Sequence, residues 1–221
     1  MQHDAVLDLI RQEKLIVIVR GVSPDQVVAL GEALYAGGIR LMEITFDQSS
    51  AQGIADTLES IRRLCGALGD KMAIGAGTVL TVKQVKLAKK AGASFIISPD
   101  AVPAVIRATR KAGLVSLPGA LTPTEITAAY AAGADMVKVF PVKSMGAGYI
   151  KDLLAPLRHI PLLAVGGISK ENVAQYLQEG AKGFGVGGSL VDKSLIAAGD
   201  WAGITANAAA FVDAIGKEGK A

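Results

Sequence analysis

TPTEITAAYAAGADMVKVFP, residues 122–141, is the segment from which the fold can be inferred, because it predicts a helix, a turn and a strand in succession. Its Thr-Pro-Thr-Glu beginning is the capping pattern of a helix start. Gly133 stands where a left-handed residue commonly ends a helix. The apolar residues that follow are typical of a buried strand. We therefore expect a helix over 122–132 and a strand over 135–140.

The same order of helix, glycine turn and strand recurs along the chain. Strands after such a turn are expected at 39–46, 94–98, 114–118 and 182–186, and strands without it at 15–19, 71–76 and 161–165. Helices are clearest over 22–36, 81–91, 103–112, 170–179 and 201–215. Alternating strands and helices require parallel pairing with right-handed crossovers. Eight such strands predict an α/β fold, a (β/α)₈ TIM barrel forming a single domain over residues 1–221.

An open, doubly wound sheet is the alternative fold. No Gly-x-Gly-x-x-Gly follows the first expected strand, where a dinucleotide-binding sheet of that type would carry it. The chain of 221 residues is 51% hydrophobic but only 5% aromatic, so its core must be aliphatic. No linker or change of composition divides it.

Charge and cysteine content narrow the partners and the compartment. The net charge is +3 without a basic cluster, so neither a nucleic-acid partner nor a membrane partner is expected. The longest apolar runs have strand length, and residues 1–10 lack the pattern of a signal peptide. Cys65 is the only cysteine, which excludes an internal disulfide and favours a cytoplasmic protein. Its thiol is expected to be a small packed side chain in a helix.

Lys138 is the most informative single residue, because it lies inside an otherwise apolar strand. Burying an unpaired ammonium costs several kcal/mol, and burial favours the neutral amine, which attacks carbonyl carbon. Strand alternation puts Lys138 on one face with Phe140, and Glu43 on one face with Thr45. If both faces line the barrel, Glu43 can move protons while Lys138 performs a covalent step. The alternative is a buried ion pair that only fills the barrel, a weak source of stability.

Further candidate residues stand at the ends of the expected strands, where a barrel forms its site. They are Arg20, Thr45, Thr78, Pro99, Gly166, Gly167, Gly188 and Ser189. The two glycine pairs follow strands seven and eight, and glycine-rich loops there expose backbone N–H groups to phosphate. Lys143 follows strand six and could reach an anion, although loop lysines are mostly surface charges.

Metal chemistry finds little support in the sequence. The only histidines are His3, near the start, and His159, just before strand seven and therefore at the opposite end from the site. No carboxylate cluster with ligand spacing stands at the strand ends. We expect no metal and no cofactor.

Six motifs in this order and spacing resemble those of one aldolase family. They are Glu43-Ile44-Thr45, Gly75-Ala76-Gly77-Thr78-Val79-Leu80, Ile97-Ser98-Pro99, Pro118-Gly119, Lys138-Val139-Phe140-Pro141 and Gly166-Gly167-Ile168. The family is the 2-keto-3-deoxy-6-phosphogluconate (KDPG) aldolase family, which includes 4-hydroxy-2-oxoglutarate aldolase and 2-keto-3-deoxy-6-phosphogalactonate aldolase. The resemblance covers almost the whole chain.

The resemblance implies a class I aldolase without a cofactor, in which Lys138 forms the Schiff base and Glu43 is the general acid/base. It implies further roles at matching positions: Arg20 and Thr78 on the pyruvate carboxylate or substrate hydroxyls, Phe140 beside the lysine, and Gly166, Gly167 and Ser189 at the phosphate. The expected reaction cleaves a KDPG-type 2-keto-3-deoxy-6-phospho sugar acid, or 4-hydroxy-2-oxoglutarate, to pyruvate and an aldehyde, phosphorylated in the first case. Family members commonly form homotrimers.

Two segments depart from the family pattern. Phe46-Asp47-Gln48 stands where the phosphogluconate branch often has an arginine, so Arg20 would carry more of the carboxylate contact. Ala164-Val165 replaces a frequent Pro-Thr and is closer to the phosphogalactonate branch. A phosphogalactonate-type aldolase is therefore an alternative. The others are a sugar-phosphate epimerase or isomerase, and a non-enzymatic assembly unit with a vestigial site.

Overall fold

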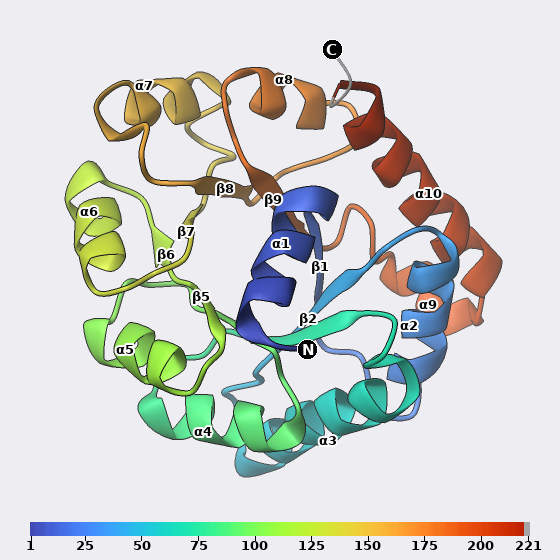
Figure 1. The fold of residues 1–221 in the computed structure, drawn as a ribbon. Helices are drawn as coiled ribbons and strands as arrows, with labels where there is room; N and C mark the ends of the chain where they lie inside the picture. Colours follow the sequence, from blue (N-terminus) through green and yellow to red (C-terminus); the bar gives the residue numbers. More distant parts are fainter. Residues whose placement is uncertain (219–221) are drawn as a thin grey trace.

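The computed structural model describes residues 1–218, and its strands form one parallel sheet. In chain order the strands are β1 (Leu15–Val19), β2 (Leu41–Thr45), β3 (Ala73–Gly77), β4 (Phe95–Ile97), β5 (Val115–Leu117), β6 (Gly119–Ala120), β7 (Val137–Val139), β8 (Leu162–Val165) and β9 (Gly183–Val186). Their spatial order is β5-β4-β3-β2-β1-β9-β8-β7-β6. Figure 1 shows them as a central ring with helices outside it. The predicted barrel is confirmed.

The barrel closes through one strand that is divided by a proline. The two ends of the spatial order, β5 and β6, are separated along the chain only by Pro118. β5 pairs with β4, whereas β6 pairs with β7. Proline has no N–H to donate, which explains an interruption of the ladder at this position. The two short strands together therefore count as the fifth of the eight strands of the barrel.

The helices cover the outside of the ring and one of its ends. They are α1 (His3–Glu13), α2 (Val27–Ala36), α3 (Ala51–Leu68), α4 (Val82–Ala91), α5 (Pro103–Lys111), α6 (Pro123–Ala131), α7 (Gly148–Leu157), α8 (Val173–Gln178), α9 (Lys193–Ala198) and α10 (Trp201–Glu218). In Figure 1 the blue helix α1 lies across the ring, while α2 to α8 and α10 surround it.

The glycine turns adopt the backbone conformation that their position in the sequence predicts. Gly38, Gly92, Gly113, Gly133 and Gly180 all have positive φ, between 72° and 107°. Each of them leads the chain from a helix into the next strand. The helix-start pattern of the opening stretch is also confirmed, because Thr122 and Glu125 form a capping box ahead of α6.

Several helices differ from the sequence-based expectation. α1 was not expected, because its short apolar stripe gives little signal by itself; Val6, Leu7 and Ile10 are buried only because they close the end of the barrel. α7 and α9 were not identified either. The helices expected from residues 22 and 170 begin later, at Val27 and Val173, because a turn precedes each of them.

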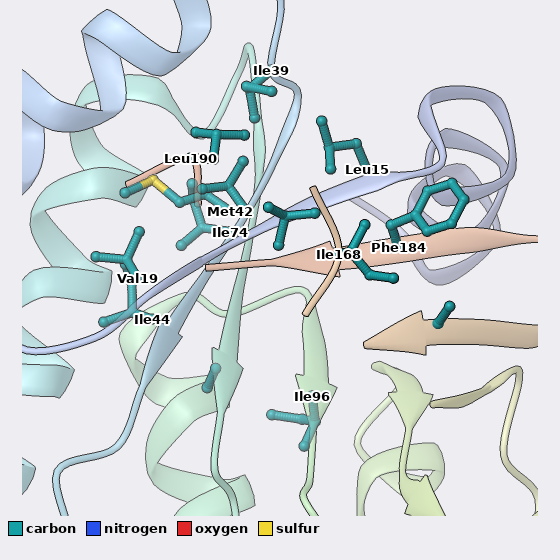
Figure 2. Packing of buried hydrophobic residues seen from close by; sticks show 14 of the residues in the cluster. Leu15, Val19, Ile39, Met42, Ile44, Ile74, Ile96, Ile168, Phe184 and Leu190 are labelled. Atoms are coloured by element: carbon teal, nitrogen blue, oxygen red, sulfur yellow. The ribbon is translucent and has the colours of Figure 1, made fainter. Parts of the chain in front are cut away.

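Two apolar layers stabilise the barrel. The inner layer fills the end of the ring opposite the carboxyl ends of the strands. It includes Phe95, Met136 and Leu163 together with α1. The outer layer lies between strands and helices, and Figure 2 shows part of it around Met42 and Phe184. With one end of the ring filled by apolar side chains, a site can form only at the other end.

Candidate active site

A cavity of about 490 Å³ opens at the carboxyl ends of the strands, the end where barrels bind ligands. Its lining contains every site residue predicted above except Thr45: Arg20, Glu43, Thr78, Pro99, Lys138, Phe140, Gly166, Gly167, Gly188 and Ser189. Lys143, whose place after strand six suggested that it could reach an anion, also lines the cavity, as do Val165 and Gly187. The lining residues to which the sequence assigned no role are Ile18, Ile168, Ser169 and Gly185.

Thr45 lies outside this lining but lines an adjoining pocket together with Arg20 and Thr78. Its side chain is buried, and its hydroxyl donates a hydrogen bond to the Val19 carbonyl oxygen at 3.2 Å. A buried hydroxyl needs a partner, and the end of the neighbouring strand β1 supplies one. Thr45 therefore links β2 to β1.

Lys138 and Glu43 lie inside the ring, in the middle of β7 and β2, and both line the cavity. The Lys138 side chain is 7% exposed and that of Glu43 is 2% exposed. Among the ion pairs of residues 1–218, none joins their charged atoms within 4.0 Å. Glu43 Oε2 is buried without a hydrogen-bond partner. An ion pair that merely fills the barrel is therefore not what the structure contains.

Burial changes the proton affinity of both groups. Desolvation raises the pKa of Glu43 to about 7, against the opposing effects of Lys138 and Arg20. Desolvation also lowers the pKa of Lys138, an effect that the Glu43 carboxylate opposes and Arg20 reinforces. A carboxyl group with a pKa near 7 can both accept and donate a proton near neutral pH, and a desolvated lysine is more often the neutral nucleophile.

Gly77 provides the space that the Glu43 carboxyl group occupies. It pairs with Thr45 across β2 and β3, and a Cβ at this position would overlap Glu43 Oε1. Glycine at 77 therefore lets the acid turn into the cavity. The Phe140 ring covers the Lys138 amine, whose Nζ lies 4.6 Å from the ring centroid. Such a contact favours a cation and screens the amine from solvent.

Arg20 and Thr78 lie together at one side of the cavity. The Arg20 guanidinium donates a hydrogen bond to Thr78 Oγ1 at 3.2 Å. Thr78 follows β3 and has a φ of +54°, which few non-glycine residues adopt. The pair presents a cation and a hydroxyl to the cavity, a combination suited to a carboxylate.

Two glycine loops and a lysine line another part of the cavity. Gly166 and Gly167 have φ of 97° and 79°, and a Cβ at Gly167 would approach the Lys143 side chain to 2.8 Å. Ser189 donates its hydroxyl hydrogen to the Ile168 carbonyl oxygen at 2.8 Å, which links the loops after β8 and β9. Open backbone and a nearby cation suit an anion such as phosphate. The sequence clue to Lys143 was its place just after the strand of Lys138.

Residues far from the cavity have ordinary structural roles. Burial raises the pKa of the Cys65 thiol to about 11, so the thiol stays protonated, and it donates to the Gly92 carbonyl oxygen at 3.4 Å. His159 packs edge-on against Tyr130, with ring centroids 5.9 Å apart. Within residues 1–218, no three potential metal-ligating His, Cys, Asp or Glu side chains gather. No helix in this part of the chain has the length and apolar character needed to span a bilayer.

Glu43→Gln should make the protein more stable at high pH. The folded-state pKa of about 7 exceeds the ordinary value of 4.5, so the stabilisation from this proton is complete below 4.5 and is lost as the pH rises through 7. The difference between these two pKa values corresponds to about 3 kcal/mol in the free energy of unfolding. Denaturant unfolding should show the variant more stable than the parent at pH 9 and nearly equal at pH 5. Glu32→Gln, at an exposed site, is the control; an equal gain at both pH values would contradict the prediction.

Comparison with known proteins gives the following relatives. Residues 6–207 match the family model described as KDPG and KHG aldolase. The chain is 38% identical over 177 residues to 2-dehydro-3-deoxy-6-phosphogalactonate aldolase of Escherichia coli strain K12, covering 80% of this chain and 83% of that protein. It is 34% identical over 203 residues to 2-dehydro-3-deoxy-phosphogluconate aldolase of Treponema pallidum, covering 91% and 93%.

A solved structure is similar over nearly the whole chain. It is the crystal structure of KDPG aldolase from Legionella pneumophila, with pyruvate captured at low pH as a covalent carbinolamine intermediate. The TM-score is 0.83 and the identity 26%, and the match covers 93% of this chain and 97% of the other. In that relative, pyruvate is held covalently.

Proposed function

The chain belongs to the KDPG and KHG aldolase family, and we therefore propose that it is a class I aldolase that cleaves a 2-keto-3-deoxy-6-phospho sugar acid to pyruvate and a phosphorylated aldehyde. We propose Lys138 as the Schiff-base residue, Glu43 as the acid/base, and the whole chain as one catalytic domain. One observation carries the proposal: a desolvated amine and an unpaired buried carboxyl group line the same cavity without forming an ion pair.

The first half of the reaction makes the keto acid cleavable. The neutral Lys138 amine adds to the C2 carbonyl and forms a carbinolamine, and loss of water leaves an iminium. Glu43 then accepts the proton of the C4 hydroxyl, directly or through a water. The C3–C4 bonding electrons move toward the iminium nitrogen, so the aldehyde leaves and an enamine remains. The chemistry needs no cofactor, because the iminium nitrogen is the electron sink.

The second half restores the enzyme. Glu43, now protonated, donates its proton to C3 of the enamine and gives the iminium of pyruvate. Water adds to this iminium, pyruvate is released, and Lys138 returns to its free amine. The same carboxyl group acts first as base and then as acid, which its pKa of about 7 supports at neutral pH.

Two groups of lining residues suit the two ends of such a substrate. Arg20 and Thr78 are proposed to hold the carboxylate next to the keto group. Pro99 and Phe140 form apolar wall around the reacting carbons. The proposed phosphate site comprises the glycine-loop residues and the nearby lysine: Gly166, Gly167, Gly188, Ser189 and Lys143.

A phosphogalactonate-type substrate is the second candidate. Two observations favour it: the 38% identity to the E. coli phosphogalactonate aldolase, and Val165 in the cavity lining, where the phosphogluconate branch often has a hydroxyl. Unphosphorylated 4-hydroxy-2-oxoglutarate is a further candidate substrate within the family. An epimerase or isomerase, or a scaffold without activity, would have no use for a desolvated lysine beside a carboxyl group.

We also propose that the enzyme is a cytoplasmic homotrimer. The single cysteine, which can form no internal disulfide, supports a reducing compartment. Ile204, Ala208 and Phe211 of α10 are buried in the barrel's own outer layer, so these three side chains are not available for a subunit contact. Light scattering on the purified protein would test the trimer.

Pyruvate release from a panel of keto acids tests the proposed function. We expect turnover of a phosphorylated 2-keto-3-deoxy sugar acid with kcat/KM higher than that of 4-hydroxy-2-oxoglutarate, because only the former reaches the glycine loops and Lys143. The panel should contain phosphogluconate-type and phosphogalactonate-type substrates, each with its unphosphorylated analogue. A coupled lactate dehydrogenase assay measures pyruvate. Absence of pyruvate release from every member would overturn the proposal.

A further inference from the structure

Thr78 is held in a backbone conformation that a β-branched residue rarely adopts. Its φ is +54°, and Lys14 is the only other non-glycine residue with positive φ in the described chain. Strain of this kind persists only where surrounding contacts over-determine the backbone. The contacts that hold Thr78 therefore show how its position in the cavity is set.

Two glutamine side chains form hydrogen bonds that bracket Thr78. Gln48 Nε2 donates to the Thr78 carbonyl oxygen at 2.8 Å. Gln84 Nε2 donates to Gln48 Oε1, also at 2.8 Å. The Leu80 N–H donates to Gln84 Oε1 at 2.8 Å. We call Gln48 and Gln84 the amide clamp. Their hydrogen bonds connect the main chain at Thr78 with the main chain at Leu80.

The main chain fixes the orientation of both amides. The Thr78 carbonyl can only accept a hydrogen bond, so the Gln48 atom that faces it must be the NH₂ group. Gln48 Oε1 then faces Gln84, which must present its own NH₂ group. The remaining oxygen of Gln84 meets the Leu80 N–H, a group that can only donate. Reversing either amide would break at least two of the three hydrogen bonds.

The clamp is anchored at its far end. Gln84 lies in the first turn of α4 and is 6% exposed, and its backbone N–H donates to Thr81 Oγ1 at 3.2 Å. Gln48 is exposed, in the loop that follows β2, and has only its side chain in the clamp. The packed Gln84 therefore holds the exposed Gln48, and Gln48 holds Thr78.

The Thr78 hydroxyl is oriented by a separate contact. Arg20 donates to Thr78 Oγ1, so the hydroxyl must direct its own hydrogen elsewhere. We propose that Gln48 and Gln84 are positioning residues, which hold Thr78 so that this hydrogen meets the carboxylate of the keto acid bound at Lys138. The inference rests on the proposed function and adds two residues to it, neither of which lines the cavity.

Pyruvate binding measured by borohydride trapping tests the clamp. Gln84→Glu keeps the oxygen that accepts from Leu80 but loses the NH₂ donor, so Gln48 must turn its amide and release Thr78. We expect the pyruvate concentration for half-maximal trapping to rise about tenfold, with the limiting trapping rate at saturating pyruvate unchanged. Gln48→Met should have the same effect. Gln52→Ala is the control, because this side chain bonds only Asp56, on its own helix.

The double variant distinguishes a clamp that acts through Gln48 from direct repulsion by the new carboxylate. If Gln84 acts through Gln48, Gln84→Glu adds nothing in the Gln48→Met background, whereas repulsion of the keto acid would persist there. Multiplying effects, or an unchanged pyruvate dependence in both single variants, would overturn the clamp and leave the aldolase function standing. Absence of any adduct in the parent protein would overturn both.

Discussion

Lys138→Met should abolish both pyruvate release and the borohydride-stable adduct with pyruvate. Among the described residues, Lys138 is the only lysine that is both buried and part of the cavity lining. Methionine has no nitrogen that could replace its amine. We expect kcat to fall by about 10⁴-fold or more. Because methionine is similar in length and uncharged, the variant should fold at least as stably as the parent. Turnover assays and denaturant unfolding measure the two effects.

Two other lysines make the test specific. Lys182→Met changes an exposed residue just before β9, at the opposite end of the barrel, and should leave the adduct and the turnover as they are. Lys143→Met changes a residue at the proposed phosphate site, so the pyruvate adduct should still form while KM for the phosphorylated substrate rises. Peptide mapping by mass spectrometry should find the reduced pyruvyl group on Lys138. An adduct on Lys143, or on any other lysine, would refute the assignment.

Gly77→Ala should remove most of the activity without replacing either of the two proposed catalytic residues, Lys138 and Glu43. The new methyl group would overlap the Glu43 carboxyl and come within 2.6 Å of its Cγ, inside a packed ring. The carboxyl must therefore turn away from the reacting carbons. We expect kcat to fall by about 10²-fold to 10³-fold, and overpacking to cost about 1–3 kcal/mol of stability. Steady-state kinetics and denaturant unfolding measure these losses.

Trapping and a second substitution separate displacement of Glu43 from misfolding. Pyruvate should still be trapped on Lys138 in Gly77→Ala, because the amine is unchanged. Combining Gly77→Ala with Glu43→Asp shortens the acid by one methylene, so part of the lost stability should return. Gly66→Ala is the matched control, because a Cβ there meets nothing within 4 Å inside α3. Full activity in Gly77→Ala would mean that Glu43 is not held where the structure has it.

The order of elements follows from local chemistry, which is why the sequence predicts it. A capping residue, a glycine in left-handed conformation and an apolar run each act within a few residues of chain. The five glycine turns and the parallel barrel follow from such signals. Lys138 and Glu43 could each be assigned to one face of a strand, because strand alternation depends only on the backbone.

Signals of that kind did not indicate α1 or the partner of the Thr45 hydroxyl. The apolar residues of α1 acquire their meaning only against the closed end of the ring. Thr45 has the alternation of an inward residue, yet the carbonyl oxygen of Val19, 26 residues away in sequence, takes its hydroxyl. The sequence left Lys143 open between an anion contact and a surface charge, and only the fold shows that it lies beside Gly167 in the cavity lining.

The barrel, the strand that carries Lys138 and the strand face that carries Glu43 follow from the sequence alone, because each depends on neighbours along the chain. Which strand-end residues meet depends instead on the folded chain as a whole. Gln48 reaches Thr78 across 30 residues of sequence, and Gln84 reaches Gln48 across 36. No periodicity connects such positions, since a side-chain hydrogen bond between loops depends on where the folded sheet puts their ends.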